Sequence, residues 1–213
     1  MRHYDVAIIG GGFAGSMAAA MLGRKGIATV LIDPHPVYPD DFRCEKLDPF
    51  QIAVLEKTGL ADVVLPGATP NHEVWVARFG RLIDHRPFAQ CGIMYNDLVN
   101  AARAAIPQQV DRIVSKAVDL ATGIDRQSLT LANGETLSAR LIVLATGLSI
   151  GLRDHLGIAR TVTSPCHSIA AGFDVMPIGR PTFAFPALTY YAERASDGFA
   201  YLSLFPIGDR MRA

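Results

Sequence analysis

The sequence predicts an α/β fold whose central sheet is parallel and is followed by a second, antiparallel sheet. A continuous apolar run at residues 6–9 is broken by three glycines, and a helical pattern begins directly after them. A second apolar run at residues 29–32 completes a β-α-β unit. Beyond residue 160, aromatic residues, prolines and turn signals replace the helical pattern.

Composition excludes several classes of protein. The chain has 213 residues, of which 50% are apolar and 19% are charged, so it can fold around one full core or two small ones and is not disordered. Lys+Arg and Asp+Glu both number 20, so no net charge attracts nucleic acid or an anionic membrane. No apolar run approaches the about 18 residues of a membrane span. We therefore expect no nucleic-acid partner and no membrane span.

The N-terminus and the cysteines predict a cytoplasmic location. The short apolar stretch after Met1 is interrupted by glycines, unlike a signal peptide. Cys44, Cys91 and Cys166 offer neither a disulfide framework nor zinc spacing. The six histidines show no ligand spacing either, so we assign no metal site. We expect Cys44, beside Arg43, to be a packed thiol.

The first region, residues 1–72, reads as strand, helix, strand and helix. A helix is predicted over about 14–25, with Gly26 just past its end, and Asp33 follows the second strand. The next helix should begin after Asp48 and end near Thr58, because Asp48 can cap it and a proline follows.

A change of period marks the next two regions. Residues 73–92 alternate like a strand hairpin, which we expect to be the first hairpin of a second domain. Residues 93–160 return to the first domain, with a helix over 96–106 and two hairpin turns at Thr122–Gly123 and Asn133–Gly134. The run at 141–144 predicts a fully buried strand.

The last region, residues 161–213, holds eight of the 17 aromatic residues and is predicted to be rich in strands and poor in helices. These aromatic side chains fit a substrate pocket and a packed core equally well. We expect this region to be part of a second β-sheet.

Residues 10–15 form a G-x-G-x-x-G motif between a buried strand and a helix. Gly10 permits a tight turn, Gly12 lets the backbone approach a pyrophosphate, and Gly15 allows close packing of helix and strand. The helix N-terminus would supply amide hydrogens to the phosphates. Asp33, eighteen residues after Gly15, could accept hydrogen bonds from a ribose. The motif predicts a dinucleotide site.

A second signal separates flavin from nicotinamide binding. Thr136 is followed after four residues by the strand at 141–144, and then by Ala145, Thr146 and Gly147. This pattern resembles the two-dinucleotide-binding flavoproteins, in which a strand ending in Ala-Thr-Gly lies beside the first strand and approaches FAD. An ordinary NAD-dependent dehydrogenase would leave this signal unexplained.

The resemblance narrows to the para-hydroxybenzoate hydroxylase class of flavin monooxygenases. The segment 147–158 is similar to the Asp-Gly signature of that class, with Arg153 in place and Thr146 where the class has Asp. The segment 42–47 resembles the arginine-bearing segment after the second strand, and Arg43 occupies the matching position. Geranylgeranyl reductases and flavin halogenases share this framework.

One motif of the class is missing. The class has a later Gly-Asp followed by small residues and His, which returns to the FAD domain. Here Gly208–Asp209 is followed by Arg210, and we predict a turn at that pair. The resemblance thus implies an N-terminal portion of such an enzyme, whose flavin site a second chain or a missing C-terminal segment would complete.

The resemblance implies a Rossmann-type FAD-binding parallel sheet with an inserted β-meander and part of an antiparallel substrate-binding sheet. It implies an FAD-binding oxidoreductase, a monooxygenase that uses NAD(P)H as transient reductant and hydroxylates a small aromatic or apolar substrate. The alternatives are a non-catalytic nucleotide-binding module and a reductase-like or halogenase-like flavoenzyme. No catalytic side chain is assigned. The residues expected to bind the cofactor are Gly10, Gly12, Phe13, Ala14, Gly15, Asp33, Arg43, Ala145, Thr146 and Gly147.

Overall fold

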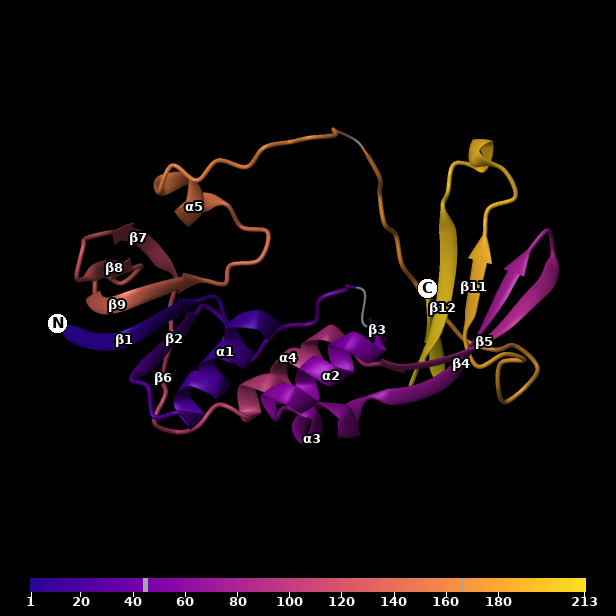
Figure 1. Ribbon diagram of the computed structural model, residues 1–213, viewed down its shortest axis with the longest axis horizontal. Coiled ribbons are helices and arrows are strands. Elements are labelled where there is room, and N and C mark those ends of the chain that lie inside the picture. Colours follow the sequence, from indigo (N-terminus) through magenta and orange to yellow (C-terminus); the bar gives the residue numbers. More distant parts are fainter. Residues whose placement is uncertain (44–45, 166) are drawn as a thin grey trace. The chain divides into compact units, whose positions relative to one another are not determined.

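The computed structural model divides the chain into two compact units (Figure 1). The first unit comprises Met1–Asp40 and Leu98–His167, and the second comprises Asp41–Asp97 and Ser168–Ala213. The structure describes residues 1–43, 46–165 and 167–213, so Cys44 and Cys166 lie outside the described residues.

The first unit contains a six-stranded sheet in the order β6-β2-β1-β9-β8-β7. Its strands, in chain order, are β1 (Arg2–Ile9), β2 (Thr29–Asp33), β6 (Asp111–Val114), β7 (Ala117–Ala121), β8 (Gln127–Leu131) and β9 (Thr136–Leu144). Strands β6, β2, β1 and β9 pair in parallel, whereas β7, β8 and β9 form an antiparallel meander. The predicted parallel sheet with its inserted meander is confirmed, and β6 is an edge strand that the sequence did not indicate.

Three helices belong wholly or partly to this unit: α1 (Phe13–Arg24), α4 (Tyr95–Ala104, in this unit from Leu98 onward) and α5 (Gly151–His155). Helix α1 ends as predicted, because the Gly26 amide donates to the Gly23 carbonyl and Gly26 has φ of 73°. Helix α4 is shorter than the predicted 96–106.

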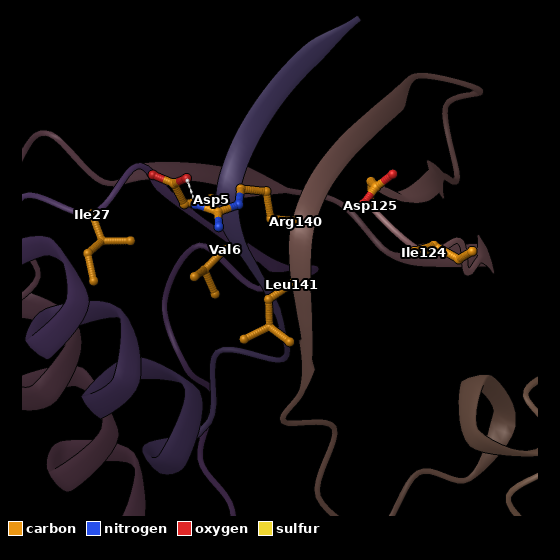
Figure 2. Close-up of a pocket in the computed structure, with 7 residues that line it drawn as sticks. All are labelled: Asp5, Val6, Ile27, Ile124, Asp125, Arg140 and Leu141. Atoms are coloured by element: carbon orange, nitrogen blue, oxygen red, sulfur yellow. Dashed lines mark hydrogen bonds and ion pairs between the residues drawn. The ribbon is translucent and has the colours of Figure 1, made fainter.

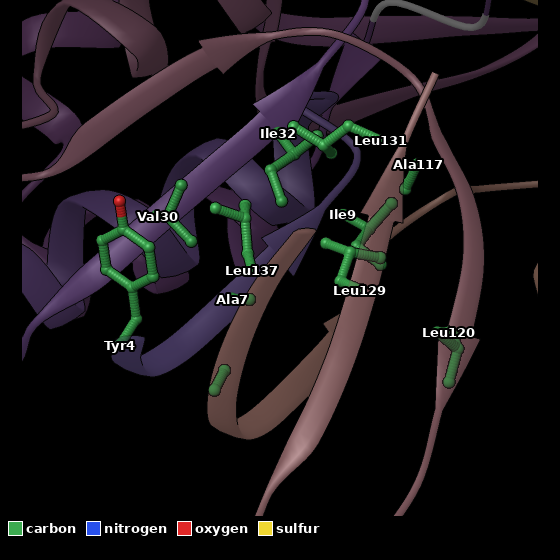
Figure 3. Close-up of a cluster of buried hydrophobic side chains, with 11 residues drawn as sticks. Tyr4, Ala7, Ile9, Val30, Ile32, Ala117, Leu120, Leu129, Leu131 and Leu137 are labelled. Carbon is green, nitrogen blue, oxygen red and sulfur yellow. The ribbon is translucent and has the colours of Figure 1, made fainter. Parts of the chain in front are cut away.

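Alternate residues of β1 supply the two faces of the buried core. Val6 and Ile8 pack against Ala19 of α1, while Ala7 and Ile9 belong to a cluster on the other face. Figure 3 shows this second cluster, in which side chains from β1 and β2 meet those of the meander. Burial on both faces is the reason why the strand is a continuous apolar run.

The second half of β9 is less buried than its sequence predicts. Leu141 is 55% exposed, and Ile142, Val143 and Leu144 are only partly buried. Residues 136–139 pair with both β1 and β8, whereas residues 141–144 pair only with β1 among the described strands. The prediction of full burial is wrong here because β8 stops short of this half of the strand.

The second unit contains a seven-stranded sheet in the order β10-β13-β12-β11-β4-β5-β3. Its strands are β3 (Lys46–Leu47), β4 (Thr69–Arg78), β5 (Arg81–Gly92), β10 (Asp174–Val175), β11 (Leu188–Tyr191), β12 (Tyr201–Ile207) and β13 (Arg210–Arg212). Only the β11–β4 pair is parallel among these described neighbours. The predicted β4–β5 hairpin and the strand-rich C-terminal region are confirmed.

Short helices accompany this sheet: α2 (Pro49–Thr58), α3 (Ala61–Val64), and the 3-10 helices η1 (Leu65–Gly67) and η2 (Ala195–Asp197). Helix α2 begins with a capping box, as predicted from Asp48. The Gln51 amide donates to Asp48 at 2.8 Å, and the Asp48 amide donates to the Gln51 side chain at 2.9 Å. Gly59, with φ of 68°, ends the helix.

A buried arginine binds the short edge strand β10 of this sheet. Arg212 is 3% exposed, and its Nε and Nη2 donate to the Asp174 carboxylate of β10 at 2.7 and 3.0 Å. Its guanidinium also lies 4.0 Å from the centre of the Phe42 ring. The preceding pair Gly208–Asp209 forms the predicted turn between β12 and β13.

Two leucines of β9 provide a matched test of this core. Leu137 is fully buried, so we expect Leu137→Ala to lower the free energy of unfolding by about 2–5 kcal/mol. Leu141→Ala, at the half-exposed position four residues later, should cost less than about 1 kcal/mol. Urea denaturation measures both values, and equal losses would contradict the described register of β9.

Candidate functional site

Three backbone segments meet where β1 turns into α1. Gly10 has φ of 104°, and a Cβ there would lie 2.4 Å from the Ala145 carbonyl oxygen at the end of β9. A Cβ on Gly15 would lie 1.9 Å from the Gly10 carbonyl oxygen. Both distances are far shorter than van der Waals contact, so these glycines allow an approach that no other residue permits.

The N-terminus of α1 faces this turn without a side-chain cap. Gly12 is the N-cap residue, and the first turn of the helix carries no acidic side chain. Ser16 is the first residue whose amide bonds back into the helix, to the Gly12 carbonyl at 2.9 Å. The amides of Phe13, Ala14 and Gly15 therefore belong to the end of the helix that attracts anions.

Asp33 lies at the end of β2, beside the glycine turn. The Gly11 amide donates to its Oδ2 at 2.6 Å, and the His35 amide donates to its Oδ1 at 2.9 Å. Arg103 Nη2 forms an ion pair with Oδ1 at 3.0 Å, although without the alignment of a good hydrogen bond. The Asp33 side chain keeps 14% of its surface exposed.

These contacts keep the Asp33 carboxyl ionised. Burial by itself would raise its pKa, but the two backbone amides and the Arg103 cation outweigh this effect, so that the pKa lies below its ordinary value. An ionised carboxylate is the form that accepts hydrogen bonds from a ribose hydroxyl.

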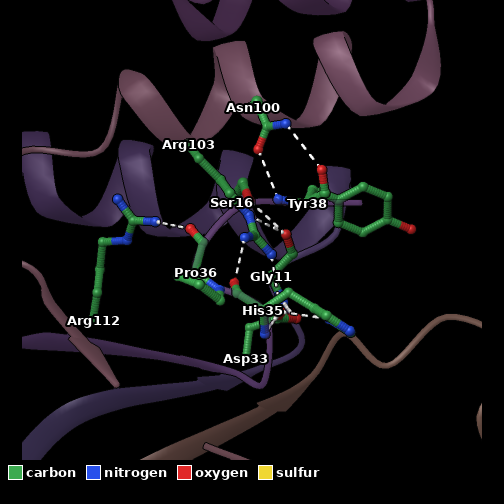
Figure 4. Close-up of polar contacts among 9 residues, drawn as sticks. All are labelled: Gly11, Ser16, Asp33, His35, Pro36, Tyr38, Asn100, Arg103 and Arg112. Atoms are coloured by element: carbon green, nitrogen blue, oxygen red, sulfur yellow. Dashed lines mark hydrogen bonds and ion pairs between the residues drawn. The ribbon is translucent and has the colours of Figure 1, made fainter. Parts of the chain in front are cut away.

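Arg103 is a residue of this site that the sequence interpretation missed. It comes from α4 and is only 4% exposed. Its Nε donates to the Gly11 carbonyl at 2.8 Å, and its Nη1 donates to the His35 carbonyl at 2.7 Å (Figure 4). Helical spacing offered a signal, because Arg103 lies four residues after Val99 on the buried side of α4.

Helix α4 also holds the segment that follows Asp33. Asn100 accepts a hydrogen bond from the Tyr38 amide at 2.9 Å and donates to the Tyr38 carbonyl at 3.1 Å. The Tyr38 ring lies 5.5 Å from the Arg103 guanidinium. Figure 4 shows Asn100 and Arg103 reaching from one helix towards this segment. The backbone after Asp33 is thus fixed from one side by α4.

The Ala-Thr-Gly segment lies beside the glycine turn, as expected. The Ala145 amide donates to the Ile9 carbonyl at 2.8 Å, which continues the β1–β9 pairing to the end of both strands. Thr146 Oγ1 donates to the Ser149 carbonyl at 3.1 Å, and Gly147 has φ of 59°. The chain therefore turns away from the sheet directly after approaching Gly10.

Arg43 belongs to the second unit, apart from the other nine predicted residues, which all lie in the first. Its Nε donates to the Asp41 carboxylate at 2.5 Å, and its guanidinium lies 4.9 Å from the centre of the Tyr95 ring. The structure brings the glycine turn, Asp33 and the Ala-Thr-Gly segment together within the first unit. The contacts described for Arg43 are with residues of the second unit.

Comparison with known families matches residues 3–212 to the family described as the FAD binding domain. The chain belongs to this family. This membership agrees with the sequence interpretation, which identified an FAD-binding oxidoreductase from the glycine motif and the Ala-Thr-Gly segment.

Two curated relatives are hydroxylating enzymes by name. The domain is 41% identical over 68 residues to 3-(3-hydroxy-phenyl)propionate/3-hydroxycinnamic acid hydroxylase 1 of Burkholderia vietnamiensis, across 32% of this chain and 11% of the relative. It is 28% identical over 166 residues to 3-amino-4-hydroxybenzoate 2-monooxygenase PtmB3 of Streptomyces platensis, across 71% of this chain and 41% of the relative.

A solved structure shares the fold of the whole domain. The structure of P. aeruginosa PqsL in complex with 2-aminobenzoylacetate matches with a TM-score of 0.77 at 23% sequence identity. The match covers 99% of this chain and 60% of the PqsL chain. The FAD-binding domain described here thus spans about three fifths of that protein.

A hollow of about 560 Å³ lies on the same unit, and Figure 2 shows its lining residues, none of which belongs to the glycine turn. Asp5 and Val6 of β1 and Arg140 and Leu141 of β9 line it. These residues precede the carboxyl ends of the strands, where ligands bind in open α/β sheets. The hollow is therefore separate from the candidate cofactor site.

The residues at the carboxyl ends of the strands fit the diphosphate and ribose of FAD. The glycine turn leaves no side chain over the uncapped amides of α1, and the Asp33 carboxylate retains acceptor capacity on Oδ2.

No helix in the described part of the chain is long and apolar enough to cross a membrane.

The close approach at Gly15 predicts a sensitive position. Gly15→Ala should force α1 away from β1, lowering the free energy of unfolding by about 1–3 kcal/mol and weakening FAD binding. Gly67→Ala is the control, since a Cβ there meets only Ile93 at 3.8 Å. Urea denaturation and FAD titration measure the two effects, and wild-type FAD affinity in Gly15→Ala would contradict the described packing.

Proposed function

We propose that this chain is the cofactor-binding part of a flavin-dependent monooxygenase that acts on a small aromatic or apolar substrate. Membership in the FAD-binding domain family supports the cofactor. The names of the Burkholderia and Streptomyces relatives support hydroxylation of an aromatic acid. NAD(P)H is the proposed reductant.

The observation that carries this proposal is the meeting of the glycine turn with the end of β9. Gly10 lies against Ala145, the uncapped end of α1 opens beside them, and Asp33 stands on the neighbouring strand. An ordinary nicotinamide site uses the glycine turn and the acidic residue, but it gives the Ala-Thr-Gly segment no task. A flavin dinucleotide uses all three.

Each group has a proposed role. The turn containing Gly10, Gly12, Phe13, Ala14 and Gly15 binds the pyrophosphate, and Asp33 accepts a hydrogen bond from the adenosine ribose. Ala145, Thr146 and Gly147 lie along the remainder of the cofactor, and Arg43 is a further proposed cofactor-binding residue on the strength of the resemblance. FAD would supply the redox chemistry, while these residues bind and orient it.

The second unit offers aromatic side chains for the proposed substrate. Trp75 of β4 lies 6.5 Å from Phe185, measured between ring centres, and Phe185 lies 5.9 Å from Phe183. Trp75 Nε1 donates to Glu73 at 2.6 Å, which fixes the indole ring on the sheet. Other aromatic residues of this region differ, because Phe205 is buried in the core and Tyr201 is 61% exposed.

FAD titration of the purified chain tests the cofactor assignment. We expect a yellow complex with quenched flavin fluorescence, and competition by ADP that is stronger than by riboflavin, because the described groups bind the adenosine half. Gly12→Val should reduce affinity by at least about 100-fold, since its side chain would cover the amides of α1. Gly67→Val, at an exposed position, should bind normally. The absence of a complex would contradict the proposal.

The chain matches only part of the length of its relatives, and this favours a second candidate function. In this candidate the chain is a nucleotide-binding module that needs additional polypeptide for activity. The chain spans 41% of the Streptomyces relative and 60% of the PqsL chain. Under this candidate the chain alone binds FAD but oxidises no NAD(P)H above the rate of free flavin. Steady NAD(P)H oxidation stimulated by an aromatic acid would instead support a complete enzyme.

A further inference from the structure

We propose that Arg103 is a positioning residue for the adenosine ribose: it holds the Asp33 carboxylate in place and leaves only one of its oxygens able to accept from the nucleotide. This inference deepens the proposed function, because it rests on the assignment of Asp33 to the ribose. Arg103 itself does not contact the nucleotide in this proposal.

One guanidinium connects the glycine turn, the segment after β2 and the Asp33 carboxylate, which together make up the ribose side of the site. Arg103 Nε binds the glycine turn at the Gly11 carbonyl, 2.8 Å away, and Nη1 binds the segment after β2 at the His35 carbonyl, 2.7 Å away. Nη2 lies 3.0 Å from Asp33 Oδ1. A side chain that is 4% exposed and committed in this way cannot turn outward without breaking all three contacts.

Gly11 shows how tightly this arrangement is packed. A Cβ on Gly11 would lie 2.6 Å from Arg103 Nη2 and 2.9 Å from Asp33 Cβ. The middle residue of the G-x-G is variable in the general motif, because the phosphate does not require glycine there. In this chain the arginine and the carboxylate require glycine at this position, so Gly11, the middle glycine of the turn, belongs to the Arg103 arrangement.

The contacts also decide which oxygen of Asp33 remains available. A carboxylate offers about four acceptor positions, two on each oxygen. Oδ1 accepts from the His35 amide and has Arg103 Nη2 only 3.0 Å away, where the guanidinium blocks a further donor, whereas Oδ2 accepts only from the Gly11 amide among the described contacts. One position on Oδ2 is left, which matches a single ribose hydroxyl. Without Arg103 the carboxylate could rotate and this selection would be lost.

Charged groups surround Asp33, so the pH dependence of nucleotide binding can report on the contact with Arg103. Helix α4 contributes Arg103, and the segment after β2 contributes His35, whose Nδ1 is 3.4 Å from Oδ1. Arg112 of β6 binds the Pro36 carbonyl at 3.3 Å, and the start of α1 presents no acidic side chain. Removal of the Arg103 cation takes away one of the causes that lower the pKa of Asp33, while the Gly11 and His35 amides remain. The pKa should therefore rise, and binding should weaken at a higher pH than in the wild type.

The test measures affinity for FAD, ADP and 2′-deoxy-ADP between about pH 8 and pH 4, a range that extends down to the ordinary carboxyl pKa of about 3.9. The wild type should bind ADP more tightly than 2′-deoxy-ADP throughout this range. Arg103→Met should bind FAD about tenfold more weakly at pH 8, lose further affinity towards pH 4, and lose the preference for the 2′-hydroxyl.

Matched variants separate the proposed role from general damage. Arg112→Met removes an arginine of β6 that binds the same segment, at the Pro36 carbonyl, but does not contact Asp33 or Gly11. This variant should retain the hydroxyl preference. His35→Gln removes the imidazole that lies 3.4 Å from Asp33 Oδ1 and keeps the backbone amide, so it should leave the wild-type pH profile in place. Asp33→Asn with Arg103→Met should bind no more weakly than Asp33→Asn alone, because both act on the same hydrogen bond.

The outcomes distinguish this inference from the proposed function. If the wild type binds neither FAD nor ADP, both are overturned. If the wild type binds FAD and Arg103→Met keeps its pH profile and its hydroxyl preference, only the inference is overturned. Should Arg103→Met fail to fold, Arg103→Lys decides, since one ammonium cannot replace the three contacts. A wild-type hydroxyl preference in Arg103→Lys would contradict the proposal.

Discussion

The candidate site depends on a place where three backbones touch without side chains between them. Gly10 and Gly15 let β1, α1 and the end of β9 approach so closely that a single methyl group would collide with a carbonyl oxygen. The approach sets the start of α1 at the carboxyl edge of the parallel sheet. Because β2 pairs with β1, the same approach brings Asp33 beside the uncapped amides. The close approach at Gly10 and Gly15 therefore places the N-terminus of α1, the Asp33 carboxylate and the Ala-Thr-Gly segment next to one another.

Each unit contains a buried arginine that pairs with an aspartate and lies close to an aromatic ring. Arg103 holds Asp33 in the first unit, with the Tyr38 ring 5.5 Å away, and Arg212 holds Asp174 in the second, with the Phe42 ring 4.0 Å away. Burying a charge is costly unless it is paired and hydrogen-bonded. Such ion pairs hold their two side chains in one arrangement, because removing one partner leaves a buried charge without its counter-ion.

The two units contribute different chemistry. The first supplies backbone amides and a carboxylate, which suit the polar half of a dinucleotide. The second supplies a sheet whose aromatic side chains, including Trp75 and Phe185, are partly exposed and suit an apolar ligand. Under the proposed function the cofactor carries the reactive group, so the protein has to bind and orient it rather than react.

The sequence by itself determined the β-α-β unit, the glycine turn, the capping box at Asp48 and the hairpin turns, because each depends on residues that are close in the chain. It also indicated the Ala-Thr-Gly segment through a resemblance. The tertiary structure decided the edge strand β6, the exposure of Leu141 and the contacts of Arg103. Arg103 contacts Gly11 across 92 residues and His35 across 68, and no local pattern encodes which distant carbonyl a buried arginine will meet. Leu141 looked like a core residue because its own run is apolar, whereas its burial depends on where β8 ends.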